Sequence, residues 1–204
     1  MMSVVSLNNI EKSYGITDVL KDFSLHVNLK EQIGLIGATG CGKTTVFKII
    51  AGMEHFSEGK FSIKKDTRIG YLSQMPDFNK NNTLFKELES IYSDLIKTEK
   101  KLHKLENEIA KKSSNNKSED LSELMNRYSK TQHIFKENGG YQYESKIREI
   151  AYGMGFSENE LTNKYIGNLS GGEKTRLGLV KLLLSEPDLL LLDEPPNHLD
   201  LSSI

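Results

Sequence analysis

The residues best suited to chemistry lie at positions 37–44, which read G-A-T-G-C-G-K-T and match the pattern G-x-x-x-x-G-K-[S/T]. Glycines in this pattern let the backbone curl so that its N–H groups point toward phosphate oxygens. Lys43 would neutralise phosphate charge, and the Thr44 hydroxyl would bind Mg²⁺. This glycine loop predicts a nucleotide site, and the alternative is a glycine-rich turn without a ligand. Its candidate residues are Gly37, Ala38, Thr39, Gly40, Cys41, Gly42, Lys43, Thr44 and Thr45.

Two carboxylates, Asp193 and Glu194, directly follow four leucines at positions 189–192. Such an apolar run is typical of a buried strand, which delivers the residues after it to the carboxyl edge of a sheet. There Asp193 would bind Mg²⁺, and Glu194 would orient or deprotonate an attacking water. Taken alone, the pair could equally cap a helix or form a turn.

Ser170 and Glu173 have the spacing of a capping box, which predicts a helix over residues 171–185. The elements around these groups alternate between strand and helix, with another helix directly after the glycine loop, and this indicates an α/β core. Strands are predicted at residues 23–29, 32–36, 60–63, 68–72 and 189–192. His26 falls on the polar face of the first of them and has no partner at metal-ligand spacing, so we interpret it as a solvated position.

The middle of the chain does not follow this alternation of strand and helix. From residue 84 onward, and again from 121 to 135, the side chains of one face recur at alternating steps of four and three. This coiled-coil spacing predicts two antiparallel helices joined by a polar turn at residues 111–118. The first helix, over residues 84–110, would make an arm on the order of 40 Å long. The seam positions are Leu84, Leu88, Ile91, Leu95, Thr98, Leu102, Leu105 and Ile109, then Leu121, Leu124, Tyr128, Thr131 and Phe135.

Three motifs occur in a fixed order: the glycine loop, L-S-G-G-E at residues 169–173, and L-L-L-L-D-E-P at residues 189–195. In this order they resemble the nucleotide-binding domain of ABC ATPases. The resemblance implies an α/β P-loop fold of the ABC type, Mg²⁺-dependent ATP hydrolysis, and a second cassette, either in cis or in a homodimer.

The same resemblance assigns further residues. It implies that Ser170, Gly171 and Gly172 contact the γ-phosphate of ATP bound by the partner cassette. It implies that Tyr14 stacks on adenine, for which an ordinary tyrosine at a strand end is the alternative. It also implies that Gln74 senses Mg²⁺ and the γ-phosphate, as a catalytic and metal-contacting residue.

Several features resemble the ABC-F branch, whose members are twin-cassette ATPases that bind ribosomes. Residues 193–200 read D-E-P-P-N-H-L-D, close to that branch's D-E-P-T-N-H-L-D. The arm lies where that branch carries one, and residues 139–147 resemble the segment after it. The resemblance implies a ribosome or ribosomal RNA partner through the arm. Residues 97–117 of the arm contain seven lysines and three glutamates. Composition alone is equally consistent with a solvated coiled-coil face, and translation regulation, ribosome assembly and antibiotic protection stay open.

We predict an ATPase core in two parts, residues 1–82 and 138–204, with the helical arm inserted at residues 83–137. The resemblance places a switch histidine, a linker and a second cassette after residue 204. We therefore expect this chain alone to bind ATP weakly and to hydrolyse it poorly or not at all.

Composition narrows the protein class. The chain has 204 residues, a net charge of −1 and one cysteine, and its apolar runs are far shorter than a membrane span. No secretory signal is readable, and we expect a cytoplasmic protein without a membrane span. The alternatives to the ABC-F interpretation are the ATPase subunit of a membrane transporter, a coiled-coil chromosome or DNA-repair ATPase, and a non-catalytic remnant that only binds nucleotide.

Overall fold

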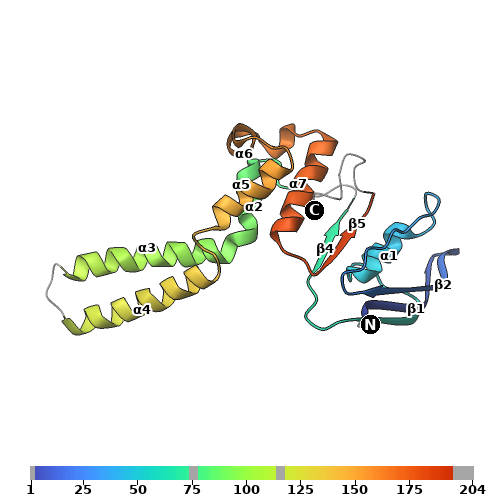
Figure 1. Cartoon of the computed structure of the whole chain (residues 1–204), viewed down its shortest axis with the longest axis horizontal. Helices are drawn as coiled ribbons and strands as arrows, with labels where there is room; N and C mark the ends of the chain where they lie inside the picture. The colour runs from blue at the N-terminus through green and yellow to red at the C-terminus, as the bar shows by residue number, and fades with distance from the viewer. Residues whose placement is uncertain (1–2, 74–77, 114–117, 195–204) are drawn as a thin grey trace. The chain divides into compact units, whose positions relative to one another are not determined.

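The computed structural model describes residues 3–73, 78–113 and 118–194. The chain forms two compact units, Met1–Pro76 together with Ser185–Ile204, and Asp77–Leu184. Figure 1 labels the helices and strands of both units. Each unit has its own apolar core. Within the described ranges, no helix combines the length and the apolar character needed to cross a membrane.

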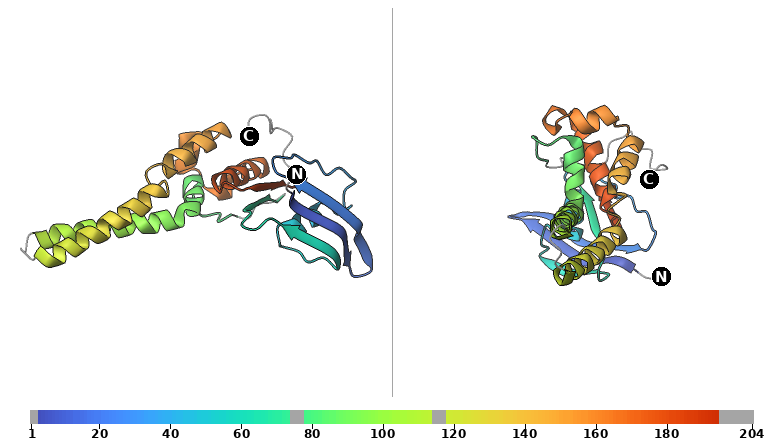
Figure 2. Two further views of the ribbon diagram at one scale, coloured as in Figure 1. Left: turned by 60° about the horizontal axis from the view of Figure 1, so that its bottom comes forward. Right: turned by 90° about the vertical axis from the view of Figure 1, so that its left-hand side faces the viewer.

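The first unit contains an antiparallel sheet in the order β2-β1-β3 (Figure 2). The strands are β1 (Ser3–Tyr14), β2 (Thr17–Asn28) and β3 (Glu58–Ile63). The predicted alternation in β2 is confirmed, and His26 is exposed, with Nδ1 2.9 Å from the Ser6 hydroxyl. The sequence pattern does not predict β1, because two asparagines interrupt its apolar alternation where the register shifts.

A second, parallel sheet joins β4 (Ile69–Leu72) to β5 (Leu189–Leu192), and both strands were expected close to these positions. Its register is set at the first pair, Ile69 opposite Leu189. Just before it, Asp188 accepts hydrogen bonds from the Arg68 backbone N–H at 2.9 Å and from the Arg68 guanidinium at 3.2 Å. The two strands therefore end side by side, and the residue after β5 lies at the carboxyl edge.

The helix after the glycine loop, α1 (Lys43–Ile50), packs into the core of this unit. Val46, Ile49 and Ile50 are each 2% exposed and share that core with Leu191 of β5. The helix of the glycine loop and the strand that carries the two carboxylates are thus held by one apolar cluster.

The predicted strand at residues 32–36 is wrong, since residues 31–38 have no regular secondary structure. Leu35 packs against the core, but Ile33 is 42% exposed and Ile36 is 98% exposed. A β-strand forms only where a neighbouring strand completes its backbone hydrogen bonds. No described strand pairs with this segment, and the apolar residues of the segment do not reveal whether such a neighbour exists.

The second unit is helical. Its core is formed by side chains from α2, α5, α6 and α7, including Leu84, Ile147, Leu161 and Leu177, which are all 0% exposed. The predicted helix over residues 171–185 is confirmed as α7. The helices are α2 (Leu84–Glu89), α3 (Ser93–Ser113), α4 (Ser118–Glu137), α5 (Tyr143–Gly153), α6 (Glu158–Asn163) and α7 (Gly171–Leu184), with 3₁₀ turns at Ser90–Tyr92 and Ile166–Asn168.

The expected continuous helix from residue 84 is corrected by the 3₁₀ turn at Ser90–Tyr92, which separates α2 from α3. Leu84 and Leu88 belong to the core of the unit and not to a coiled-coil seam. The spacing of these residues fits both a core-facing helix and a coiled coil, so the sequence pattern did not distinguish the two. With 21 residues, α3 extends about 31 Å, less than the predicted arm.

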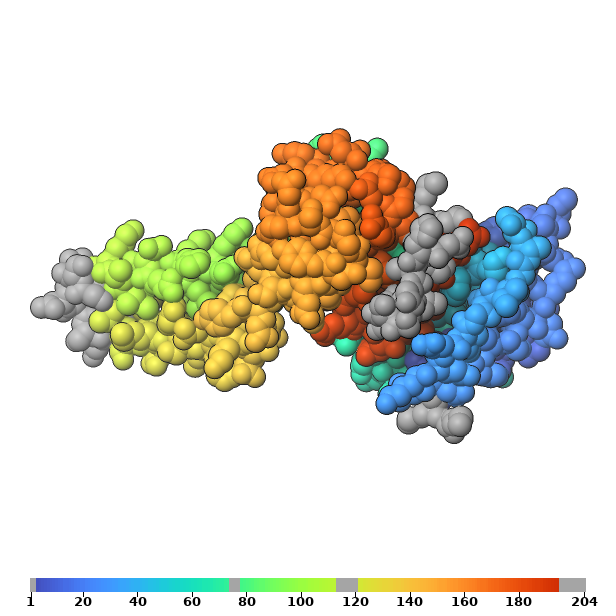
Figure 3. Space-filling view, turned by 45° about the horizontal axis from the view of Figure 1, so that its top comes forward, coloured from blue at the N-terminus to red at the C-terminus, as the bar shows by residue number. Residues whose placement is uncertain are grey.

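Helices α3 and α4 lie side by side as a hairpin, called here the α3–α4 hairpin (Figures 1 and 3). The seam predicted from Thr98 to Phe135 is confirmed by burial: Leu102, Leu105 and Leu124 are 6%, 3% and 5% exposed. Phe135, at the end of the seam, is 2% exposed. The structure groups the hairpin with the other helices in one unit, and the domain boundaries at residues 82 and 138 stay a prediction.

Candidate functional site

The glycine loop closes around the ammonium group of Lys43. Its Nζ donates hydrogen bonds to the carbonyl oxygens of Gly37, at 2.8 Å, and Ala38, at 2.9 Å. The Cys41 N–H donates to the Ala38 carbonyl at 3.3 Å and closes a turn within the loop. A cation at the centre of curled backbone is the arrangement that would receive an anionic group.

Gly42 is required where the loop meets the sheet. Its φ of +96° lies in the left-handed region, and a Cβ there would be 2.8 Å from a Leu20 methyl carbon and 3.1 Å from the Val19 carbonyl oxygen. A side chain would therefore push the loop away from β2. Directly after it, Thr44 is exposed at the start of α1, whereas Thr45 is 8% exposed and faces the core.

Asp193 is buried at the end of β5, with 5% of its surface exposed. The Tyr71 hydroxyl donates a hydrogen bond to its Oδ2 at 3.2 Å, and its own N–H donates to the Leu72 carbonyl at 3.1 Å. Burial, with the charge and hydrogen bond of Asp193, raises the pKa of Tyr71 to about 12, so this hydroxyl stays a donor at neutral pH. Sequence reasoning missed Tyr71, because only the pairing of β4 with β5 brings it to Asp193.

Glu194 is exposed and has a φ of +50°, in the left-handed region that non-glycine residues rarely adopt. Holding it there costs about 1 kcal/mol or more. The strand thus ends in a sharp turn that separates two adjacent carboxylates, one buried and one in solvent.

The predicted capping box at α7 is confirmed. The Ser170 N–H and hydroxyl both donate to Oε2 of Glu173, at 2.7 and 2.8 Å, and the Glu173 N–H donates back to the Ser170 oxygen at 3.3 Å. Lys164, which sequence reasoning missed, donates to the other carboxylate oxygen at 2.6 Å. Its hydrogen bond is the largest cause that lowers the pKa of Glu173 to about 2, followed by those of Ser170.

Tyr14 ends β1 and is 47% exposed, and the Lys12 ammonium lies 4.7 Å from its ring centre. Lys12 also forms an ion pair with Glu54 at 2.7 Å, which is the largest cause that lowers the pKa of that carboxyl. Gln74 and residues 195–200 lie outside the described residues.

The candidate metal ligands of this site are oxygen donors. Within the described residues, no group of three or more imidazole, thiol or carboxylate side chains could hold a metal ion. Mg²⁺ does not require such a cage, because it takes one or two protein oxygens and completes its shell with phosphate and water. The Thr44 hydroxyl and the Asp193 carboxylate are oxygen donors of this kind, so the residues present fit a nucleotide-bound Mg²⁺.

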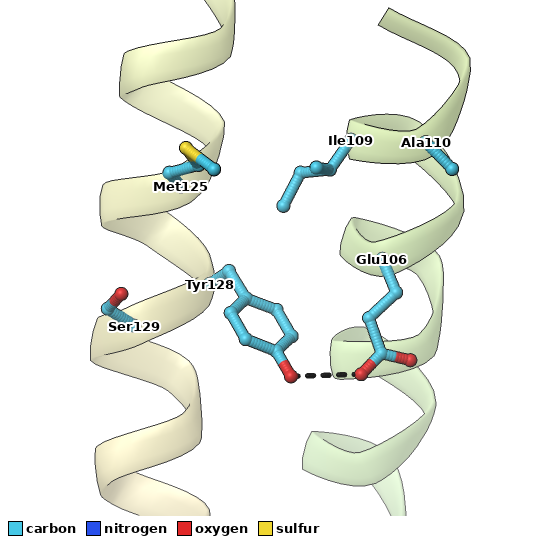
Figure 4. A pocket seen from close by; sticks show the side chains of 6 residues that line it. All are labelled: Glu106, Ile109, Ala110, Met125, Tyr128 and Ser129. Carbon is cyan, nitrogen blue, oxygen red and sulfur yellow. Dashed lines mark hydrogen bonds between the residues drawn. The ribbon is translucent and has the colours of Figure 1, made fainter. Parts of the chain in front are cut away.

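A groove of about 470 Å³ lies between α3 and α4, far along the chain from the glycine loop (Figure 4). The Tyr128 hydroxyl donates to Glu106 at 2.9 Å across it and joins the two helices. Its lining includes Ile109 and Met125, so the groove is mainly an apolar gap in the seam.

Comparison with known proteins gives a family match over most of the chain. The family model described as "ABC transporter" matches residues 20–197, a range that contains the glycine loop, the 169–173 segment and both carboxylates.

Three curated relatives span the whole of this sequence or nearly so. The ATP-binding protein YdiF of Bacillus subtilis is 37% identical over 203 residues, which is 100% of this chain and 31% of that protein. The ABC transporter F family member 5 of Arabidopsis thaliana is 33% identical over 99% of this chain and 29% of its own length. The energy-dependent translational throttle protein EttA of Escherichia coli is 32% identical over 91% of this chain and 32% of its own length. The chain thus spans about a third of the length of these relatives.

A solved structure of the ATP-binding subunit of an ABC transporter is similar in fold. Its TM-score is 0.65 at 20% identity, and the match covers 98% of this chain and 70% of that one. At this identity the similarity shows the fold alone, and that fold is the P-loop fold of ABC ATPases.

Proposed function

This chain belongs to the ABC transporter family, and from that premise we propose that it is an ATP-binding cassette of the ABC-F type that hydrolyses ATP and acts on the ribosome. The observation that carries the nucleotide part is the glycine loop closed around the Lys43 ammonium. The ABC-F part is supported by the relatives, one an F family member and one a translational throttle protein. The α3–α4 hairpin, with its exposed lysines, supports a polyanionic partner.

The residues of the loop would bind the phosphates of ATP. Lys43 would exchange its hydrogen bonds to the Gly37 and Ala38 carbonyls for phosphate oxygens, and the loop N–H groups would donate to the same anion. Thr44 and Asp193 would hold Mg²⁺, and the resemblance to ABC ATPases assigns Gln74 to the same ion. The metal ion, when bound, neutralises the charge that develops on the phosphates.

Other residues would orient the substrate and the water. Glu194, exposed at the sharp turn after β5, would position and deprotonate the attacking water. Lys12 covers one face of the Tyr14 ring, so adenine would stack on the other. Ser170, Gly171 and Gly172 would contact the γ-phosphate of ATP on a second cassette, in cis or in a homodimer.

Titration calorimetry with MgATP tests the nucleotide site. Lys43→Ala should lower the affinity at least tenfold because it removes the central cation, whereas Lys48→Ala, on the exposed face of α1, should not change it. Unchanged affinity in Lys43→Ala would contradict the site.

Sedimentation of cell extracts in ATP tests the ribosomal role. Glu194→Gln should slow hydrolysis and increase the fraction of the protein that sediments with ribosomes. The second candidate, an ATPase subunit of a transporter, is favoured by the similar solved structure. Sedimentation of the same variant with membranes, and not with ribosomes, would support that candidate instead.

A further inference from the structure

The carboxylate of Glu173 is bound through both of its oxygens at the start of α7. Oε2 accepts from the Ser170 N–H and hydroxyl, at 2.7 and 2.8 Å, and Oε1 accepts from Lys164 at 2.6 Å. With a pKa of about 2, this carboxyl is ionised throughout the physiological range. A full negative charge therefore lies one to three residues from Ser170, Gly171 and Gly172.

The negative charge of Glu173 disfavours phosphate binding at residues 170–172, which is the role proposed for them. A helix start attracts anions because its first N–H groups are unpaired and the helix dipole is positive there. A carboxylate in the same place repels an incoming phosphate unless a cation neutralises it.

Lys164 is held where it can neutralise this charge. Its N–H donates to the Glu160 carbonyl at 3.1 Å, and its own carbonyl accepts from the Leu84 N–H at 3.3 Å, so its backbone is fixed on both sides. Its ammonium lies 2.6 Å from Glu173 and 3.4 Å from Glu160. The Lys164 and Glu173 side chains are 29% and 20% exposed, so solvent screens their interaction only in part.

We propose that Lys164 is a positioning residue that neutralises Glu173, so that the phosphate of a nucleotide on a second cassette can dock at residues 170–172. The inference rests on the proposed function, because it assumes that this segment receives that phosphate. It adds a charge requirement: the segment accepts an anion only while the Glu173 carboxylate is neutralised.

A purely structural role makes different predictions. If Lys164 only strengthened the cap of α7, removing either member of the pair would weaken the segment, and removing both would be as harmful or worse. If the charge matters, removal of Glu173 should compensate for removal of Lys164, since the double variant keeps the same net charge as the reference over Lys164, Glu173 and Glu160.

The experiment measures the dissociation constant for ATP-dependent pairing of cassettes by sedimentation velocity, in a Glu194→Gln background that slows hydrolysis. Lys164→Met should weaken pairing about fivefold to tenfold, with a smaller deficit at high salt. Glu173→Gln should pair at least as tightly as the reference. The dissociation constant of the double variant should lie within about twofold of the reference value, and that of Lys164→Arg should equal the reference value.

Controls separate the outcomes. Lys97→Met makes the same charge change at an ion pair on α3, where Lys97 lies 2.8 Å from Asp94, and should leave pairing unchanged. If Lys164→Met folds poorly, Glu173→Ala still decides, because alanine removes both the charge and the cap acceptor, so the cap role predicts weaker pairing and the charge role does not. Weak pairing of the double variant, or of Glu173→Gln, would overturn the inference. A reference protein that binds ATP without any pairing would overturn the proposed partner contact itself.

Discussion

Single side chains in this protein depend on neighbours that are distant in the sequence. Asp193 receives a hydrogen bond from Tyr71, and Glu173 receives one from Lys164. In both pairs the partner determines whether a carboxylate near the proposed nucleotide contacts is oriented or neutralised. The residues of the motifs themselves are therefore only part of the site.

Removing the Tyr71 hydroxyl should loosen Asp193. Tyr71→Phe leaves a 5% exposed carboxylate without this donor, which should lower the free energy of unfolding by about 1–3 kcal/mol. Urea denaturation measures this change, and MgATP affinity should fall with it. Tyr152→Phe is the matched control, because the Tyr152 hydroxyl also donates to a carboxylate, Glu158, but the residue is 46% exposed. Equal effects of the two variants would contradict a special role for Tyr71.

The elements are stabilised by two means, apolar seams and charged caps. In the α3–α4 hairpin, Leu102 and Leu105 of α3 and Leu124 and Phe135 of α4 are all buried. At α7, the first turn is secured by the capping box and the Lys164 ion pair. The stability of the hairpin should therefore depend on the volume of its buried side chains, and the stability of the start of α7 should depend on the charges of its side chains.

Leu105→Ala should destabilise the hairpin. The side chain is 3% exposed in the seam, and its truncation should cost about 2–4 kcal/mol. Hydrogen exchange of the amides in α3 and α4 should accelerate, because the two helices have few other partners along the seam. Glu108→Ala, on the exposed face of the same helix, should change exchange little. Similar exchange in both variants would contradict the seam.

The ionised form of Glu173 should make the helical unit sensitive to acid. Its pKa is lowered from 4.5 to about 2, so its stabilisation is complete above about pH 4.5 and is lost as the pH falls toward 2. Thermal unfolding between pH 7 and pH 3 should show a steeper decline below pH 5 in the wild type than in Glu173→Gln. Parallel declines would mean that other carboxylates account for the acid sensitivity.

For the molecule as a whole, charge is distributed unevenly although the total is only −1. Lysines gather on α3, where Lys100, Lys101 and Lys104 are exposed. A locally basic hairpin on a nearly neutral protein directs a polyanion to one part of the chain.

Replacement of these three lysines by alanine should weaken cosedimentation with ribosomes at low salt, and the deficit should shrink as salt is raised. Each lost phosphate contact should reduce the slope of log affinity against log salt by about 1. Lys64→Ala with Lys65→Ala, on the exposed turn after β3, serves as a control and should have no effect. Loss of binding in the control alone would assign the contact to the other unit.

The sequence by itself determined the local features: the glycine loop and its helix, the cap of α7, strand β5 with its two carboxylates, and the period of the α3–α4 seam. These depend on residues within a few positions of one another, so spacing alone encodes them. Only the tertiary structure decided that residues 32–36 form no strand here, that the helix from residue 84 breaks at Ser90–Tyr92, and that Tyr71 and Lys164 reach the carboxylates. Ladder partners, core partners and ion pairs across many residues depend on the packing of distant segments, which local spacing does not record.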